Sequence, residues 1–584
     1  MTSLSLLTPD LSVSEVHDGI VIEPRTPLPE PAPTILHWLD RWAAERPDQI
    51  FLAERGVGGE WRKVSYAEAA QAVPRIARRL AERSAGPARP VLILSDNSVS
   101  HALVALAAFH VGAPAVPVSP AYSLVSSSFR RLKHVVSLID PAVIYAEDPE
   151  SFGKALEAVG AAPKRVLSAG DVDAASSLEP LPREDIGPQT IAKVLFTSGS
   201  TGEPRGVINT HRMLTANQES LFACWPFLAN EPPVVVDWLP WSHTFGGNHN
   251  FNLVLKNGGS LYVDRGRPAP GLVEVTLENL ADVGPTLWFN VPRGFDQAVS
   301  ELERKPERAQ AAFRNLRVIF YAAAALGAST RSRLEAVARA AGGPEPFFTS
   351  AWGSTETSPL STSAHFPTRT TGVLGVPVPG VALKLARVED RFEIRVKGPN
   401  VTPGYWQKGG SIRPIDLDAD GFLPTGDAGR LVDEAHPEQG VAFAGRLSEN
   451  FKLSSGTWVN VGNLRLSVVE ACAPLVLDAV IAGHDREYLG VLLFPSPAVA
   501  RDLPKDELRL RIYRALEKHG QTHSSSSEHV RRAVILERPL SLDDGETTDK
   551  GYTNQRRVLE QRASDVERLF AADLDPDVLV IDSD

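Results

Sequence analysis

Short apolar runs alternate with longer amphipathic stretches over most of the chain. Between residues 35 and 42 the apolar side chains fall at helical spacing, which predicts a helix. Further along, a series of short apolar runs predicts strands, with helical stretches between most of them. These runs are residues 91–94, 142–145, 194–196, 234–239, 261–263, 287–289 and 318–321. Such alternation is typical of an α/β fold, in which helices cover largely parallel sheets.

The pattern changes twice along the chain, which suggests a division into domains. Residues 1–34 include a Pro-rich segment and are predicted to be an extended lead-in. Residues 35–447 would form a large domain, within which glycines and prolines punctuate short strands of a β-rich subdomain at about 370–445. Residues 448–584 are enough for a separate small α+β domain, which is predicted to be mobile and to close with an amphipathic helix. That helix would carry Val558, Val566, Leu569 and Phe570.

Composition narrows the classes of function. The 584 residues have 43% hydrophobic and 22% charged side chains, as in a soluble globular protein, and the formal net charge is −11. Proteins that bind nucleic acid usually carry a basic excess, because neutralisation of phosphates supplies most of their affinity. A nucleic-acid partner is therefore not expected, and a polyanionic ligand would need a local basic site.

Three features indicate a cytoplasmic protein. Cys224 and Cys472 lie far apart without metal-ligand spacing, and we expect both to be reduced and buried. The N-terminus shows neither the basic start nor the apolar core of a signal peptide. No uninterrupted apolar run of membrane-spanning length occurs, so no membrane partner is expected.

The segment TSGSTGEPRG at residues 197–206 is the most informative motif. Its glycines allow a backbone to approach an anion closely, its hydroxyls can donate hydrogen bonds to phosphate, and Arg205 adds a cation. A flexible Ser/Gly linker is the alternative, but this segment lies between an apolar strand and a helical stretch. We therefore predict a phosphate-binding loop. Its residues are Thr197, Ser198, Gly199, Ser200, Thr201, Gly202 and Arg205.

This loop resembles the signature of the adenylate-forming superfamily, which comprises acyl- and aryl-CoA synthetases, luciferases and adenylation domains. The family usually has Lys where this chain has Arg205, and either cation can lie near the phosphates. Further landmarks follow in the family's order. They are WGSTE at 352–356, FEIRVKGPNVTPGYW at 392–406, PTGD at 424–427 and GR at 445–446.

The resemblance implies a two-step reaction with ATP, Mg²⁺ and coenzyme A. A carboxylate attacks the α-phosphorus of ATP to give an acyl-adenylate and pyrophosphate, and a thiol then displaces AMP. Glu356 and Thr197 would hold the metal ion, because Mg²⁺ prefers oxygen ligands. The remaining nucleotide contacts would be made by residues that face adenine or ribose. They are Ala322, Ala323, Ala324, Trp352, Gly353, Thr355, Asp427 and Arg446.

Three residues of the last 140 are implied to act in catalysis or domain movement. Lys550, in TTDKGYTNQR, would stabilise negative charge on the α-phosphate in the first step. Ser448 lies at the family's interdomain hinge, and Lys452 would replace Lys550 when the small domain rotates for the second step.

The strip LPWSHTFGGNHN at residues 239–250 would separate the acid pocket from the thiol tunnel. It contains no acidic residue to pair a buried ammonium, so amino-acid substrates are disfavoured. Its aromatic and small residues favour a flat acid, with His243 as a gate, and His249, Asn248 and Asn250 near a ring hydroxyl. The substrate-pocket residues are Trp241, His243, Phe245, Gly246, Gly247 and His249.

Among superfamily members the strip and the FKLSSGTWV and TDKGYTNQR segments resemble bacterial feruloyl-CoA synthetases. A hydroxycinnamic acid such as ferulate is the substrate class that this resemblance implies. A ligase for benzoate or medium-chain fatty acids remains an alternative, as does a non-catalytic nucleotide-binding protein on the same scaffold. A homodimer is also left open.

Overall fold

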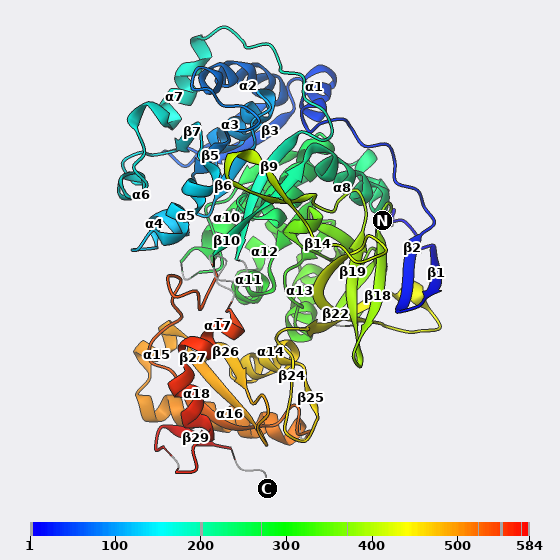
Figure 1. The fold of residues 1–584 in the computed structure, drawn as a ribbon, viewed down its shortest axis with the longest axis vertical. Coiled ribbons are helices and arrows are strands. Elements are labelled where there is room, and N and C mark those ends of the chain that lie inside the picture. The colour runs from blue at the N-terminus through cyan, green and yellow to red at the C-terminus, as the bar shows by residue number, and fades with distance from the viewer. Residues whose placement is uncertain are drawn as a thin grey trace.

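The computed structural model describes residues 4–198, 203–269, 271–370, 372–523, 525–548, 553–573 and 575–581. A large body of sheets and helices contains most of the chain, and the C-terminal part lies at one end of the long axis (Figure 1). Within the described residues, no helix has both the length and the apolar character needed to cross a membrane.

The first sheet has 15 strands and is parallel at its centre. In spatial order its strands are β1 (Leu11–Val16), β2 (Gly19–Pro24), β18 (Ala382–Val388), β19 (Arg391–Lys397), β22 (Leu423–Leu431), β23 (Val441–Arg446), β17 (Val373–Pro377), β16 (Leu360–Ser363), β15 (Phe347–Gly353), β14 (Val318–Tyr321), β13 (Leu287–Asn290), β11 (Val234–Asp237), β12 (Ser260–Val263), β3 (Ile50–Arg55) and β4 (Trp61–Ser65). Residues 370–445, predicted as a β-rich subdomain, contain antiparallel strands that are divided between the two sheets: β17, β18, β19, β22 and β23 continue the first sheet, and β20 (Gly404–Trp406) and β21 (Ile412–Pro414) belong to the second.

The second sheet has eight strands and carries the predicted phosphate-binding motif. Its spatial order is β21 (Ile412–Pro414), β20 (Gly404–Trp406), β10 (Pro204–Thr210), β9 (Ile191–Ser198), β6 (Ala115–Val118), β5 (Val91–Leu94), β7 (Val143–Ala146) and β8 (Val166–Leu167). The four residues of β5 are all apolar and fully buried, as expected for a parallel strand covered on both faces.

Helices cover the sheets of the large body, which confirms the α/β prediction. They begin with α1 (Leu36–Glu45), where the sequence predicts a helix. The others are α2 (Tyr66–Ala81), α3 (Val99–His110), α4 (Ala121–Leu124), α5 (Arg130–Ile139), α6 (Gly153–Ala158), α7 (Ala169–Ala174), α8 (His211–Cys224), α9 (Phe251–Lys256), α10 (Val273–Val283), α11 (Pro292–Arg304), α12 (Pro306–Phe313) and α13 (Ala328–Ala341).

The C-terminal part forms its own sheet between two helical layers. The strands are β26 (Val476–Ala482), β27 (Leu489–Pro495), β28 (Val530–Ile535) and β29 (Val578–Val580), and a short pair, β24 (Phe451–Lys452) with β25 (Trp458–Val459), precedes them. One layer contains α14 (Val461–Ala471) and α16 (Lys505–Thr522), and the other contains α17 (Gln555–Gln561) and α18 (Ala563–Phe570); α15 (Pro497–Asp502) connects β27 to α16. Alternate residues of β26 and β27 face opposite layers, as the strand period of two requires.

Two predictions at the ends of the chain are wrong. The lead-in contains a β-hairpin, β1–β2, whose second strand pairs with β18. An alternating apolar pattern on both sides of Asp18–Gly19 is the sequence signal for this hairpin. The predicted closing helix is divided into α17 and α18 at Arg562, and strand β29 follows it.

Candidate active site

The two strands that flank the predicted phosphate-binding motif form an antiparallel pair. β9 and β10 are antiparallel, with Thr197 opposite Arg205 and Ser198 opposite Pro204. Gly206 has no room for a side chain, because a Cβ atom there would lie 2.7 Å from Val194 Cγ1. Because they are opposite each other in this pair, Thr197 and Arg205 lie close to where the two strands are connected. Gly199, Ser200, Thr201 and Gly202 lie outside the described residues.

Arg205 and Glu356 both contact Tyr405, a residue that the sequence did not single out. The Arg205 guanidinium carbon lies 4.8 Å from the centre of the Tyr405 ring, and that of Arg413 lies 4.9 Å from it. The Tyr405 hydroxyl donates a hydrogen bond of 3.5 Å to Glu356 Oε1. Burial, and then the charge of Glu356, raise the pKa of Tyr405. The predicted phosphate-binding cation and metal ligand thus lie in one cluster.

The sequence gives a partial signal for Tyr405 and none for Arg413. Tyr405 belongs to the GYW sequence that ends the 392–406 segment, but this motif alone does not indicate a role for the tyrosine side chain. Its position follows from pairing between β10 and β20, where Val207 is opposite Tyr405. Arg413 reaches the ring because β20 pairs with β21, a contact that no local sequence pattern shows.

The predicted adenine-facing residues follow the carboxyl end of β14. Ala323 and Ala324 are exposed, and Ala323 has a φ of 74°, a left-handed conformation that costs energy for alanine. On the neighbouring strand β15, a Cβ atom at Gly353 would lie 1.6 Å from the Pro359 carbonyl oxygen, so only glycine fits. Thr355 follows in a buried turn. Ligands commonly bind at the carboxyl edge of parallel strands, where these residues meet.

Trp352, Asp427 and Arg446 come together at the same edge. The Trp352 indole N–H donates a hydrogen bond of 2.9 Å to Asp427 Oδ2, and Arg446 Nε lies 3.6 Å from Asp427 Oδ1. Asp427 and Arg446 are opposite each other on β22 and β23. Burial raises the pKa of Asp427, while Arg446 and the Trp352 hydrogen bond oppose the rise. The contact between Trp352 and Asp427 was not predicted.

The acid-pocket strip forms a π-helix at Thr244–Asn250, which is followed directly by α9. π-Helical turns are rare and frequently mark functional sites. Buried side chains from several elements anchor this turn. Asn248 Nδ2 donates to Asn209 Oδ1 at 2.6 Å, and Gln218 Nε2 donates to the carbonyls of Asn248 and His249. His243 lies at the N-terminal end of the turn, where its carbonyl accepts a hydrogen bond from Gly247 N.

The two glycines of this turn serve backbone packing. A Cβ atom at Gly246 would lie 2.2 Å from the Leu239 carbonyl oxygen, and one at Gly247 would lie 2.3 Å from that of Trp241. The direction in which a side chain would extend is therefore filled by backbone. Gly246 and Gly247 stay predicted pocket residues, and protein occupies the space on the side where a Cβ atom would lie. The Trp241 ring is buried against His101 and Phe251, at centroid distances of 5.2 and 5.1 Å.

His249 lies in an aromatic cluster with Phe245, Phe289 and Phe320. The ring centroids of the three phenylalanines are 5.8, 5.6 and 4.8 Å from that of His249. His249 Nδ1 donates a hydrogen bond of 2.9 Å to Asn250 Oδ1, because Asn250 Nδ2 is directed to Asp237 Oδ2 at 2.8 Å. Burial lowers the pKa of His249 to about 4, so the ring is neutral. The predicted amide partners Asn248 and Asn250 thus already bind protein groups.

Lys193, which the sequence analysis did not single out, is buried and contacts the π-helix at Thr244–Asn250. Its Nζ donates a hydrogen bond of 2.6 Å to the Gly247 carbonyl and lies 5.9 Å from the Phe251 ring centre. Burial lowers the pKa of Lys193 to about 7. A lysine within the otherwise apolar run of β9 was the available signal.

The predicted hinge and second-step residues lie between the two parts of the chain. Ser448 is exposed in the turn that follows β23. Lys452 is exposed on β24, and its Nζ lies 4.6 Å from the ring centre of Trp458. Trp458 in turn donates a hydrogen bond to Asp390 and contacts the Arg391 guanidinium at 3.9 Å. Lys550 lies outside the described residues.

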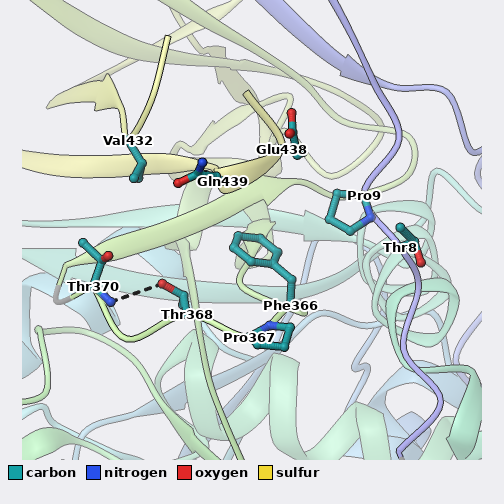
Figure 2. A pocket seen from close by; sticks show the side chains of 9 residues that line it. All are labelled: Thr8, Pro9, Phe366, Pro367, Thr368, Thr370, Val432, Glu438 and Gln439. Carbon is teal, nitrogen blue, oxygen red and sulfur yellow. Dashed lines mark hydrogen bonds between the residues drawn. The ribbon is translucent and has the colours of Figure 1, made fainter. Parts of the chain in front are cut away.

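A surface cavity of ≈ 330 Å³ lies elsewhere on the large body (Figure 2). Thr8, Pro9 and the segment around Phe366 line it, together with Val432, Glu438 and Gln439. The Thr370 N–H donates to Thr368 Oγ1 at 3.3 Å on its rim. No residue predicted to bind ATP or acid is among those that line this cavity, so it is separate from the candidate site described above.

Comparison with known protein families identifies the class of protein to which this chain belongs. The AMP-binding enzyme family matches residues 39–406, and the AMP-binding enzyme C-terminal domain matches residues 450–574. The chain belongs to this adenylate-forming family.

The individual proteins that match this chain share about a quarter of its residues. A carboxylic acid reductase of Mycobacterium marinum is 26% identical over 89% of this chain, which spans 48% of that protein. The long-chain-fatty-acid–CoA ligase FadD15 of Mycobacterium bovis is 24% identical, with 92% of this chain and 98% of the ligase covered. The fold resembles the adenylation domain of a carboxylate reductase from Mycobacterium chelonae, with a TM-score of 0.74, 21% identity and coverage of 93% and 92% of the two chains. ATP-bound MatB from Rhodopseudomonas palustris superimposes with a TM-score of 0.68 and 22% identity, covering 91% and 99%.

Proposed function

We propose that this protein joins an aromatic carboxylic acid, of the hydroxycinnamic class, to AMP and then to the thiol of coenzyme A. The observation that carries the proposal is the cluster of Arg205, Tyr405 and Glu356 at the base of the phosphate-binding hairpin. It places a cation and a carboxylate beside the turn that would hold the phosphates of ATP. Phosphoryl-type transfer depends mainly on positioning and charge neutralisation, which such a cluster can supply.

The residues present fit a magnesium ion. Glu356 offers carboxylate oxygens, and Thr197 offers a hydroxyl at the base of the neighbouring hairpin; both are hard ligands of the kind Mg²⁺ prefers. When bound, the ion would neutralise phosphate charge. The protein's own contribution is Arg205, whose guanidinium is held against Tyr405 and aimed by that contact.

The ribose and adenine would lie at the carboxyl edge of β14 and β15. Asp427 can accept hydrogen bonds from two hydroxyls, because a carboxylate offers only acceptors. Trp352 fixes the orientation of Asp427 through its indole N–H, and Arg446 lies on the other side of the carboxylate. Ala322, Ala323 and Ala324 offer small side chains beside the flat adenine ring.

The aromatic cluster around His249 supports a flat, apolar acid. Phe245 is only partly buried, whereas His249, Phe289 and Phe320 are buried beneath it. Asp237, the nearest acid to the strip in sequence, uses one oxygen for Leu239 N and the other for Asn250. No carboxylate of the strip is available to pair a substrate ammonium, which disfavours amino acids.

The relatives support a second candidate for the acceptor thiol. Carboxylic acid reductases match most of this chain, and one similar structure contains an adenylation domain joined to a carrier domain. The acyl group could therefore pass to the phosphopantetheine thiol of a carrier protein instead of to coenzyme A. Both thiols attack the same acyl-adenylate, so the first step is common to the two candidates.

Release of pyrophosphate and AMP tests the proposal directly. The complete reaction contains ATP, Mg²⁺, ferulate and coenzyme A, and each is omitted in turn. Pyrophosphate should require ferulate but not coenzyme A in the first turnover, and AMP should accumulate only with the thiol. Turnover of alkanoates alone would refute the aromatic class, and ATP binding without pyrophosphate release from any acid would indicate a non-catalytic protein.

A further inference from the structure

The two parts of the chain meet where a serine triad, Ser126–Ser128, binds the carboxylate of Asp543. Ser126 Oγ donates to Asp543 Oδ1 at 2.6 Å, and Ser128 Oγ donates to the same oxygen at 3.1 Å. Ser127 donates to Oδ2 from both its hydroxyl, at 3.1 Å, and its backbone N–H, at 3.2 Å. These hydrogen bonds lower the pKa of Asp543, with that from Ser126 the largest contribution.

The serine triad is held in place by the start of α5. The backbone N–H of Phe129 donates to Ser126 Oγ at 3.1 Å, and that of Arg130 donates to Ser128 Oγ at 3.3 Å. The hydroxyls therefore accept bonds from their own helix end while they donate to Asp543. An acceptor with two oxygens and full negative charge matches this set of donors.

The same helix also contacts the phosphate-binding hairpin. His134 Nε2 donates to the Pro204 carbonyl at 3.0 Å, and His134 Nδ1 lies 3.3 Å from Glu203 Oε2. His134 is the fifth residue of α5, which begins two residues after Ser128. The site that binds Asp543 and the end of the nucleotide loop are thus fixed to one rigid element.

On the C-terminal side, Asp543 belongs to a braced loop. Glu546 is fully buried and accepts hydrogen bonds from Arg562 Nε at 2.6 Å, Arg562 Nη2 at 2.9 Å and Ser541 N at 2.9 Å. Just beyond, Thr547 and Thr553 form an antiparallel bridge across residues 549–552, the segment that includes the predicted Lys550. Fixing Asp543 therefore fixes the base of that segment.

We propose that Asp543 and the serine triad form a latch that holds the C-terminal part in the orientation for acyl-adenylate formation, so that Asp543 is a positioning residue for the first half-reaction. This inference rests on the proposed function. If the small domain rotates so that Lys452 replaces Lys550 for the thiol step, the latch must open before that step. The latch should therefore favour one half-reaction and not the other.

The test measures the two half-reactions separately in Asp543→Ala. Pyrophosphate release with ATP and acid should fall by about 10- to 100-fold, since several hydrogen bonds to a charged group are lost. Thioester formation from preformed acyl-adenylate and coenzyme A should stay within about twofold of the unmodified protein or rise. Asp544→Ala is the matched control: the neighbouring carboxylate is exposed, and its removal should leave both half-reactions unchanged.

Equal loss of both half-reactions would indicate a general structural role and overturn the latch, as would unchanged pyrophosphate release. Hydrogen exchange at the Ser127 amide provides a readout independent of activity, since that N–H donates to Asp543. Exchange should accelerate in Asp543→Ala but not in Asp544→Ala. If the unmodified protein activates no acid, the proposed function fails, and the exchange measurement alone decides whether the latch exists; unchanged exchange would refute it.

Discussion

Glu356 carries the charge on which the metal hypothesis depends. Glu356→Gln keeps the size of the side chain and its contact with Tyr405 but removes a negative charge. We expect pyrophosphate release to fall by roughly 10- to 1,000-fold, with a higher Mg²⁺ concentration needed for half-maximal rate. The measurement is the initial rate across a Mg²⁺ titration. Glu345→Gln, an exposed acid, should behave like the unmodified protein; an unchanged Mg²⁺ dependence in Glu356→Gln would remove Glu356 from the metal site.

Lys193 gives a prediction for stability against pH. Its pKa is about 7 in the folded protein, below the ordinary value of 10.5, so the unfolded chain binds more protons between these values. This group therefore destabilises the fold by roughly 4 kcal/mol at pH 7, and the penalty disappears as the pH rises towards 10. Lys193→Met removes this penalty but also removes the hydrogen bond from Nζ to the Gly247 carbonyl, which anchors the π-helix. The melting temperature of the variant, relative to that of the unmodified protein, should therefore be higher at pH 7 than at pH 9.5. A difference that does not change with pH would show that Lys193 does not titrate in this range.

At the residue scale, sequence indicated the site only where a motif is local. Arg205, Glu356 and Asp427 belong to short motifs; Arg205 and Glu356 share the contact with Tyr405, Asp427 lies with Trp352 and Arg446, and their roles stay predictions. Tyr405 lies beside Arg205 because β10 pairs with β20, and the Lys193 side chain reaches the Gly247 carbonyl from β9. A contact between elements far apart in sequence has no local pattern, so the sequence indicated neither position.

The π-helix at Thr244–Asn250 is packed closely against neighbouring backbone at its two glycines. Gly246→Ala would place a Cβ atom 2.2 Å from the Leu239 carbonyl oxygen, so the turn or the 239–241 backbone must move. We expect a loss of about 1–3 kcal/mol in the free energy of unfolding, as for overpacked interiors, together with a raised KM for the acid.

Urea unfolding and acid titrations measure the two effects of Gly246→Ala. The matched control is Gly153→Ala in α6, where a Cβ atom would meet nothing within 4 Å, and its stability should be unchanged or slightly higher. If Gly246→Ala kept its stability and a normal KM for the acid, the π-helix would be able to shift without loss of function, and the prediction would be wrong.

At the scale of elements, strands buried on both faces were predictable because their sequences are continuously apolar. The hairpin β1–β2 was missed, since the neighbouring prolines dominated the interpretation of residues 1–34. The π-helix could not be predicted, because its turn depends on anchors supplied by Lys193, Asn209 and Gln218 from other elements. Local propensity is overridden there by tertiary contacts.

At the scale of the whole molecule, the α/β architecture followed from the alternation of strands and helices. The sequence did not show that β17, β18, β19, β22 and β23 join the parallel strands in a single sheet. This connection depends on the pairing of β15 with β16. The contact of Asp543 with Ser126–Ser128 joins residues more than 400 positions apart and had no sequence signal.

The two catalytic lysines predicted for the C-terminal part give the sharpest test at this scale. In the present orientation the Lys452 ammonium rests on the Trp458 ring, whereas the Thr547–Thr553 bridge, which spans Lys550, belongs to the loop docked by Asp543. Lys550→Ala should lower adenylate formation by orders of magnitude and leave thioester formation from preformed adenylate largely intact. Lys452→Ala should do the reverse, because its ammonium would be needed only after the small domain rotates. Quenched-flow measurement of pyrophosphate and acyl-CoA separates the steps; if each variant lost both half-reactions equally, one orientation would serve the whole reaction and the rotating-domain hypothesis would be wrong.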